Sequence, residues 1–288
     1  MIDAHHHLWD LRAVHYPWLM DPAQRFFGDP APIRRNYRLP EFRADAEAAG
    51  GYGSVHIQVG AEDGLAEAQW VQAVCDEHPD WDMRQVVFCD LTRPDLDDVF
   101  ADFAVLPSVV GIRQIVGRAP EEDMATGTND LLRNPAFVEG LKCLADRGWS
   151  FDLQLIPELM PAMAQVIDQV PGLNVALCHA GSPYDRTESG LAHWAALLRN
   201  LSSCANVVCK ISGLGMFDHG WTVGAFRPIV SEVLGQFGAD RVMFGSNFPV
   251  CSLTSDYATL AGAMRELVPE ADHPAVFEQT AQAFYFKT

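Results

Sequence analysis

Short runs typical of β-strands alternate with longer amphipathic runs along the whole chain of 288 residues. The short runs are rich in aliphatic residues, and the longer ones repeat apolar residues every three or four positions, as helices do. The predicted strands are 2–7, 54–60, 83–91, 109–116, 150–156, 174–179, 206–212 and 241–246. The predicted helices include 65–77, 135–147, 159–170, 191–201 and 223–237, and two more, 257–267 and 274–284, follow the eighth strand.

An eightfold alternation without a linker or a change of composition predicts a single α/β domain, 1–288, folded as a closed (β/α)8 barrel, the TIM barrel. A doubly wound open sheet is the alternative. It would have fewer strands and a glycine-rich turn after the first, whereas this first strand ends in His5, His6 and His7. The non-periodic segment 8–40 is longer than an ordinary strand-to-helix connection. We expect this N-terminal insert to fold over the barrel mouth.

The composition of the chain limits the classes of molecule that it is expected to bind. Hydrophobic residues make up 49% of the chain, enough for a large core, and the formal net charge of −18 disfavours binding to nucleic acid or anionic membranes. The 7 cysteines form no CxxC pair, which favours reduced thiols and a cytoplasmic protein. No apolar run is as long as a membrane span, and no secretion signal is evident. We expect a small-molecule substrate, and leave homo-oligomerisation open.

Polar residues collect at the ends of the predicted strands, where barrel enzymes place their active sites. His5 and His7 share one face of the first strand, since side chains alternate along a strand. The others are His56, Gln58, Arg113, Asp152, Gln154, His179, Lys210 and Asn247. Alternation predicts that His56 and Gln58 face the site and that Val55, Ile57 and Val59 face the helices. Each polar residue also has a structural interpretation: Arg113 or Lys210 would serve equally as an interior ion-pair partner of Asp152 or Asp3.

The motifs resemble the amidohydrolase superfamily, and more narrowly its amidohydrolase-2 branch of sugar lactonases, pyrone dicarboxylate lactonases and decarboxylases. They are Asp3-Ala4-His5-His6-His7-Leu8-Trp9-Asp10, Gly111-Ile112-Arg113, Phe151-Asp152-Leu153, His179-Ala180-Gly181-Ser182-Pro183, Lys210-Ile211-Ser212-Gly213-Leu214 and Phe244-Gly245-Ser246-Asn247-Phe248-Pro249-Val250. The resemblance implies a (β/α)8 barrel in which His5, His7 and His179 form the reaction centre. Most relatives carry an aspartate at position 247, but this chain has Asn247, and an amide is a poor proton acceptor.

The resemblance leaves the cofactor open between a divalent metal, Zn or Mn, held by His5, His7 and His179, and no metal. Three neutral imidazoles suffice for a catalytic zinc. The function it favours is hydrolysis of a lactone or similar cyclic ester of a small carboxylated or sugar-derived substrate. The proton would pass to Asp152, His56 or a metal-bound hydroxide, while Arg113 and Lys210, helped by Arg34 or Arg35, bind substrate. His56, Gln58 and Gln154 complete the predicted substrate contacts. The alternatives are a decarboxylase and a ligand-binding barrel that has lost catalysis.

Overall fold

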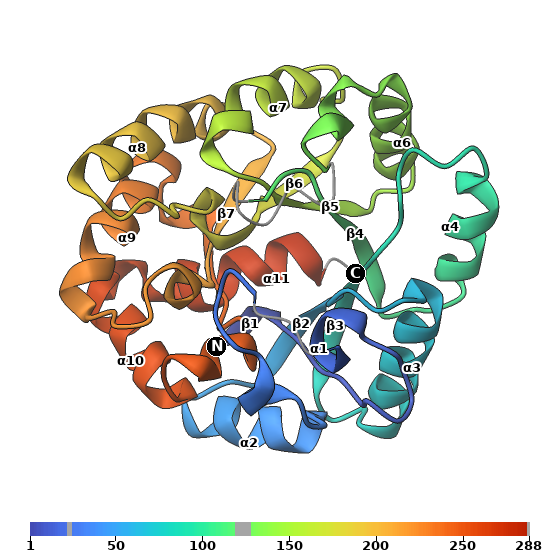
Figure 1. Ribbon diagram of the computed structural model, residues 1–288, viewed down its shortest axis with the longest axis horizontal. Coiled ribbons are helices and arrows are strands. Elements are labelled where there is room, and N and C mark those ends of the chain that lie inside the picture. The colour runs from blue at the N-terminus through green and yellow to red at the C-terminus, as the bar shows by residue number, and fades with distance from the viewer. Residues whose placement is uncertain (22–24, 119–127, 287–288) are drawn as a thin grey trace.

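The computed structural model describes residues 1–21, 25–118 and 128–286, and eight parallel strands form its central sheet (Figure 1). Each strand pairs with the next in sequence. The strands are β1 Ile2–His6, β2 Gly53–Ile57, β3 Asp82–Val87, β4 Val109–Ile115, β5 Ser150–Gln154, β6 Asn174–Leu177, β7 Val207–Ile211 and β8 Val242–Phe244. Backbone hydrogen bonds between β1 and the segment after β8 close the ring: the Asn247 N–H donates to the His5 carbonyl, and the His7 N–H to the Phe248 carbonyl. The predicted closed barrel is confirmed.

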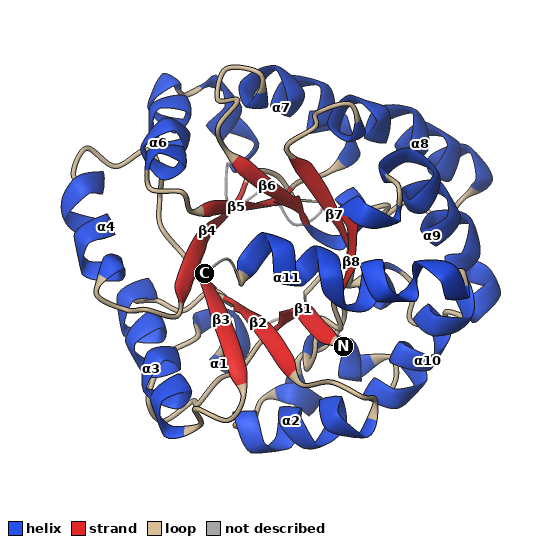
Figure 2. Cartoon of the chain, turned by 180° about the vertical axis from the view of Figure 1, so that it is seen from behind, coloured by secondary structure: helices blue, strands red, loops and turns tan. Residues whose placement is uncertain are grey.

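Helices surround the sheet, as Figure 2 shows from behind. Those in the described residues are α1 Pro17–Met20, α2 Leu39–Ala48, α3 Gly64–Glu77, α4 Leu96–Ala104, α6 Pro135–Asp146, α7 Met160–Ile167, α8 Glu188–Ser202, α9 Val223–Phe237, α10 Tyr257–Leu267 and α11 Thr280–Tyr285. The predicted helices 223–237 and 257–267 match α9 and α10. Helices α2 and α4 were not among the predictions. No helix in the described ranges is both long and apolar enough to span a membrane.

The last helix closes one end of the barrel. Ala281 and Tyr285 of α11, followed by Phe286, pack against aliphatic side chains inside the ring. Those side chains come from five strands: Ile2, Ala4, Val55, Ile57, Val86, Ala176 and Met243. Figure 1 shows α11 lying across the middle of the ring of strands. The interior is therefore a filled core at this end, and the space for a site is at the other end.

The orientation predicted for the second strand is wrong. Val55 and Ile57 of β2 point into the barrel, where they join the core against α11, and His56 points out toward the helices. Alternation along a strand shows which residues share a face, but not which face is inside. Interior space near α11 is filled by aliphatic side chains, and this packing sets the orientation of β2.

A bulge in β1 brings its histidines to the inner face. The pairing with β2 shifts from Asp3 opposite Ser54 to His6 opposite His56, so β1 holds one extra residue. Because of this residue, Ala4 lies in the inner core while His5 contacts the ring of His179. His6 points outward and stacks on Phe42 of α2, with ring centroids 3.8 Å apart. The bulge turns His5 and His7 toward the mouth.

Candidate active site

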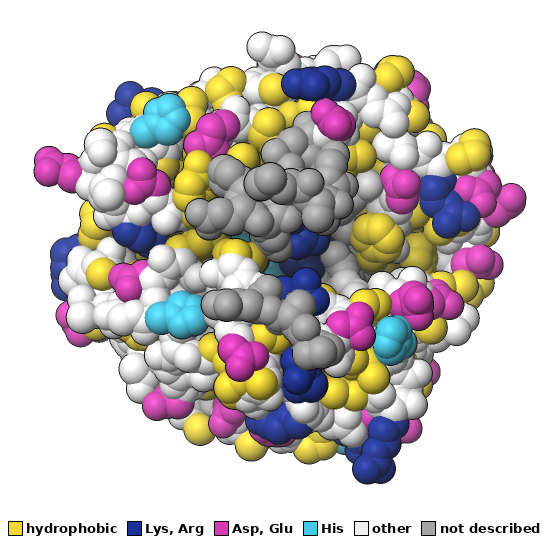
Figure 3. Space-filling model, in the orientation of Figure 1, with side chains coloured by type: hydrophobic (Ala, Val, Ile, Leu, Met, Phe, Trp, Pro, Cys, Tyr) yellow, Lys and Arg dark blue, Asp and Glu magenta, His cyan; other side chains and the backbone are white. Residues whose placement is uncertain are grey.

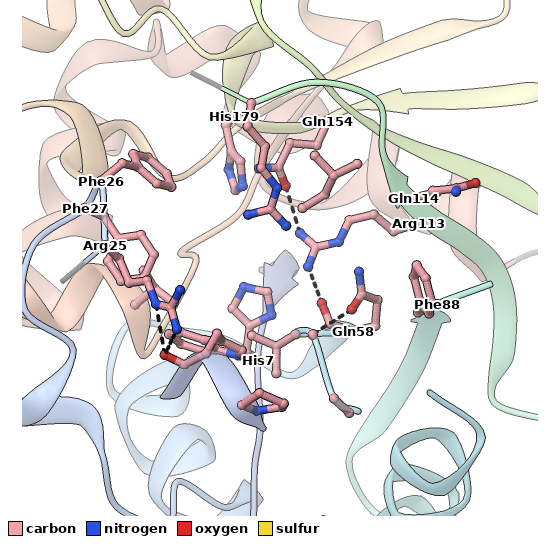
Figure 4. Close-up of a pocket in the computed structure, with 18 of the residues that line it drawn as sticks. His7, Arg25, Phe26, Phe27, Gln58, Phe88, Arg113, Gln114, Gln154 and His179 are labelled. Atoms are coloured by element: carbon pink, nitrogen blue, oxygen red, sulfur yellow. Dashed lines mark hydrogen bonds between the residues drawn. The ribbon is translucent and has the colours of Figure 1, made fainter. Parts of the chain in front are cut away.

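A cavity of about 750 Å³ opens at the carboxyl ends of the strands. Six of the predicted site residues line it: His7, Gln58, Arg113, Gln154, His179 and Asn247. Figure 4 shows Arg113 reaching into the cavity from β4, between Gln58 and Gln154, with His7 and His179 nearby. The insert supplies another part of the wall, including Trp18 and Phe27, which confirms its predicted place over the mouth.

The three predicted histidines converge. The ring centroids of His5 and His7 are 5.2 Å apart, and those of His5 and His179 are 4.5 Å apart. Burial lowers the pKa of all three, and the positive charge of Arg113 contributes to each shift. The pKa of His179 falls to about 3, and those of His5 and His7 lie well below their ordinary value. The imidazoles are therefore neutral at pH 7, and each has a lone pair to offer.

Two of the histidines are oriented through Nδ1. The Nδ1 of His7 lies 2.7 Å from the Ile57 carbonyl and donates to it, and the Nδ1 of His179 lies 3.0 Å from the Ser212 hydroxyl. The backbone of His179 has φ of 55°, in the left-handed region, directly after β6. Both nitrogens of His5 are buried without a hydrogen-bond partner among the described residues. Unpaired buried imidazole nitrogens are costly, and they indicate a ligand or water at this point.

Asn247 faces the cavity beside His7. Its Oδ1 lies 3.1 Å from His7 Nε2, and its Nδ2 lies 3.5 Å from the sulfur of Cys251. A neutral imidazole carries one N–H, which His7 already gives to Ile57, so Nε2 is an acceptor facing an oxygen. Reversing the amide would turn its NH2 toward His7 and its oxygen toward the Cys251 thiol, which satisfies both contacts.

Arg113 is a buried cation held by neutral acceptors. Its guanidinium donates to the Gln58 carbonyl and, at 3.1 Å, to Gln154 Oε1. Its side chain is buried, and desolvation lowers its pKa. The Gln58 side chain accepts from the Gly60 N–H at 2.8 Å. Since no ion pair with a described carboxylate neutralises Arg113, its charge acts on the histidines and on whatever occupies the cavity.

Asp152 and Lys210 lie below the histidines, outside the cavity wall. Lys210 Nζ donates to Asp152 at 2.5 Å and to the Ala4 carbonyl at 2.8 Å. The hydroxyl of Tyr285, from α11, contacts both Asp152 oxygens at 2.8 and 2.9 Å. The interior ion pair between Lys210 and Asp152, one of the two sequence interpretations, is confirmed. Its groups are fully engaged with one another and do not reach the cavity.

His56 is also outside the cavity. Its Nδ1 accepts from the Leu8 N–H at 3.1 Å, and its Nε2 lies 3.8 Å from Glu67 on α3. The two insert arginines that were expected to help bind substrate, Arg34 and Arg35, do not line the cavity either. Arg34 donates to the Leu19 carbonyl, and Arg35 pairs with Glu41 on the surface.

Two basic residues of the wall, Arg25 and Arg118, were not among the predicted site residues. Trp18 and Phe27, whose rings meet edge to face at 5.9 Å, also belong to the wall. Arg25 donates twice to the Trp18 carbonyl, at 3.0 and 2.8 Å. The aromatic pair could be suspected from its place in a long insert. Nothing in the sequence distinguishes Arg25 from the insert arginines that point away.

Comparison with known proteins decides the family. The amidohydrolase family model matches residues 2–287. The chain belongs to the amidohydrolase family. This amidohydrolase is 34% identical to the uncharacterized protein y4mH of Sinorhizobium fredii, over 99% of this chain and 98% of the relative. It is 27% identical to the L-fucono-1,5-lactonase of Burkholderia multivorans, over 99% of this chain and 95% of that protein.

Solved structures agree on the fold. An amidohydrolase from Burkholderia multivorans with bound HEPES superposes with a TM-score of 0.84 at 25% identity, covering 100% of this chain and 99% of the other. A second crystal form with bound zinc gives 0.83 at 24% identity, with the same coverage. Both are barrels of the family to which this amidohydrolase belongs.

The histidines suit a metal chemically. They are neutral, and Nδ1 of His7 and Nδ1 of His179 are engaged with the Ile57 carbonyl and the Ser212 hydroxyl, so that a metal would bind through the lone pair of Nε2. Both nitrogens of His5 lack a hydrogen-bond partner among the described residues. In the described part of the chain, however, no three His, Cys, Asp or Glu side chains are already arranged around one point as metal ligands are. An ion would have to displace the Asn247 amide from His7. The three imidazoles therefore fit a divalent metal ion, although the Asn247 amide now contacts Nε2 of His7.

The buried histidines predict a loss of stability on acidification. Burial holds the pKa of His5, His6 and His7 well below the ordinary 6.5 and that of His179 at about 3. Below pH 6.5 the unfolded chain binds protons that the folded chain does not, so the free energy of unfolding falls. Asp3 acts in the opposite sense, because burial raises its pKa to about 6 and the folded carboxyl binds a proton first. The four histidines lower the free energy of unfolding on acidification, and Asp3 alone raises it. The net result should be a fall of a few kcal/mol between pH 7 and pH 5.5.

Urea unfolding at the two pH values measures this fall. A His6→Phe variant should reduce the dependence on pH, since phenylalanine can keep the stacking on Phe42 without titrating. A variant of an exposed residue, His193→Gln, should leave it unchanged. A free energy of unfolding that stays constant or rises on acidification would contradict neutral buried imidazoles.

Proposed function

We propose that this amidohydrolase hydrolyses a lactone. The observation that carries the proposal is the joint exposure of two neutral imidazoles, His7 and His179, and one buried guanidinium, Arg113, to a single cavity. Hydrolysis of an ester needs a group that accepts a proton from water and a positive group near the carbonyl oxygen, and these residues supply both. The relatives in Burkholderia that are named L-fucono-1,5-lactonase support the same reaction.

In the proposed mechanism the lactone carbonyl lies toward Arg113, whose charge stabilises the oxyanion as it forms. A water molecule attacks the carbonyl carbon and gives its proton to Nε2 of His179, in the tautomer whose Nδ1–H donates to the Ser212 hydroxyl. The oxyanion then collapses, the ring C–O bond breaks, and the leaving oxygen takes the proton from the imidazolium. The product is an open hydroxy acid. Neither Asp152 nor His56 takes part as proton acceptor, since neither lines the cavity.

We assign His5, His7 and His179 as the residues that would hold a divalent ion, Zn²⁺ or Mn²⁺. Such an ion would supply Lewis acidity at the lactone carbonyl. Zinc titrated calorimetrically into metal-free protein should bind with one site, and the variant His5→Gln should weaken this binding about 10-fold or more. His193→Gln serves as the control. Equal zinc affinity in wild type and His5→Gln would refute the assignment, whatever the activity.

The reaction is tested by following acid release from a panel of five- and six-membered lactones in weakly buffered solution. Hydrolysis of at least one lactone, lost in His179→Asn, supports the proposal. If no lactone is opened while an aromatic acid releases carbon dioxide, the protein is a decarboxylase. If a lactone or hydroxy acid binds but nothing turns over, the barrel is a binding protein.

We infer a cytoplasmic protein from its cysteines. All seven are free thiols, and none is bonded to another. Proteins of oxidising compartments usually pair their cysteines. Fractionation of the native host, with the protein detected in the soluble cytoplasmic fraction, is the expected result. A homo-oligomer stays a prediction for sedimentation analysis.

A further inference from the structure

Three arginines, Arg25, Arg113 and Arg118, line the cavity, and the printed contacts of the first two go to neutral acceptors. Arg113 is held by the Gln58 carbonyl and the Gln154 amide oxygen, and Arg25 is held by the Trp18 carbonyl. Among the described residues, no carboxylate forms an ion pair with Arg25 or Arg113. Figure 4 shows these two arginines approaching the cavity from different sides, with His7 between them. Both are fixed in place by neutral acceptors, so that their charges remain available to a ligand.

Two other arginines of the insert have acidic partners. Arg35 pairs with Glu41 at 2.5 Å, and Arg38 pairs with Asp10 at 2.5 Å. The chain carries 38 acidic residues against 20 basic ones, so an acidic partner is easy to supply. Figure 3 shows Lys and Arg side chains in the central hollow of this face, whereas the acidic side chains lie mostly around it. The positive cavity is therefore a local exception to a strongly negative protein.

Two carboxylates, Asp21 and Asp90, also line the cavity, but within the described residues neither forms an ion pair with Arg25 or Arg113. Asp90 Oδ1 already accepts hydrogen bonds from the backbone and hydroxyl of Thr92 and from Gln114. Asp21 is exposed. Around Arg25 the wall is aromatic: Phe26 lies 5.1 Å from Phe27, and Phe27 packs on Trp18. Apolar walls lower the local dielectric and strengthen the attraction of Arg25 for an anion.

We propose that the lactone carries a carboxylate and that Arg25 binds it, while Arg113 serves the reacting carbonyl. The substrate is then the lactone of a dicarboxylic acid, anionic at neutral pH, and not a neutral sugar lactone. Arginine suits this task because its planar guanidinium matches a carboxylate. Two of the Arg25 nitrogens are committed to Trp18, which fixes the direction of the remaining donors. This inference rests on the proposed function for its substrate, but its test includes binding alone.

The first arm compares pairs of lactones that differ only in one group: galactaro- and glucaro-1,4-lactone, which carry a carboxylate, against galactono- and glucono-1,4-lactone, which carry a hydroxymethyl group. Wild type should prefer an anionic lactone at least 10-fold in kcat/KM. In Arg25→Gln this preference should shrink about 10- to 100-fold, which is the range expected for the loss of one hydrogen bond between charged groups. The change should appear as a higher KM for the anionic lactone. Arg25→Lys should recover part of the preference. Arg34→Gln is the matched control, because Arg34 is also anchored by an insert carbonyl but does not line the cavity.

The second arm measures calorimetric binding of galactarate and galactonate, the open acids, and needs no turnover. Galactarate should bind more tightly, and Arg25→Gln should remove the difference. Equal hydrolysis of charged and neutral lactones by wild type, or a preference that survives Arg25→Gln, overturns the carboxylate inference and leaves lactone hydrolysis standing. If no lactone in the panel is hydrolysed while galactarate binding still depends on Arg25, the proposed reaction fails and the anion site stands. Equal binding of both acids overturns the anion site.

Discussion

Replacing His179 with asparagine lowers kcat/KM for lactone hydrolysis by about 10²- to 10⁴-fold, the range typical of a lost general base. Asparagine tolerates the left-handed backbone that His179 adopts, with φ of 55°, so the variant should fold. It cannot accept a proton from water, because its amide is not basic. Steady-state kinetics on the best lactone of the panel, with the melting temperature measured in parallel, separates loss of chemistry from loss of fold.

Two further variants sharpen this experiment. Ser212→Ala removes the contact that orients His179, so it should cost less activity than His179→Asn. His193→Gln should be silent. If His179→Asn keeps more than a tenth of the wild-type kcat/KM with an unchanged melting temperature, the proton passes to another group and the mechanism is wrong.

Replacing Lys210 with methionine destabilises the fold by about 3–5 kcal/mol, because it leaves the Asp152 carboxylate buried without its counter-charge. Both side chains are fully buried, so solvent does not screen the pair. Methionine preserves much of the volume of lysine. The Tyr285 hydroxyl would remain as the hydrogen-bond donor to Asp152. Urea unfolding at pH 7 measures the loss.

The double variant Asp152→Asn with Lys210→Met is the control. Since it removes both charges, it should recover most of the stability lost in Lys210→Met, as buried pairs replaced together often do. A single variant within about 1 kcal/mol of wild type would show that the ion pair is not the buried contact described here. Losses that simply add in the double variant would show the same.

The fold could be predicted because its evidence is local and repeated eight times. Strand runs and amphipathic runs follow directly from the periodicity of the side chains. The direction of each face could not be predicted for β2, because alternation pairs His56 with Gln58 but carries no information about the interior. Packing of Val55 and Ile57 against α11 decides it, and this contact joins residues more than two hundred positions apart.

A site residue could be predicted when its position at the end of a strand is enough to bring it to the cavity. His7, Arg113 and His179 could be predicted in this way. The convergence of His5 with them depends on the bulge in β1, which exists only in the pairing with β2. Asp152 and Lys210 were recognisable as buried charges, but only their depth, beside Tyr285, shows that they serve each other. Arg25 was missed because the position of an irregular loop is set by tertiary contacts.

In the proposed mechanism His7 and His179, which lie 172 positions apart in the chain, act as one reaction centre. The direct test is the kcat/KM for lactone hydrolysis of His7→Gln, His179→Asn and the double variant. If the two residues act as a unit, the double variant loses little more than the worse single variant. Losses that multiply, or a single variant with wild-type turnover, would contradict the claim.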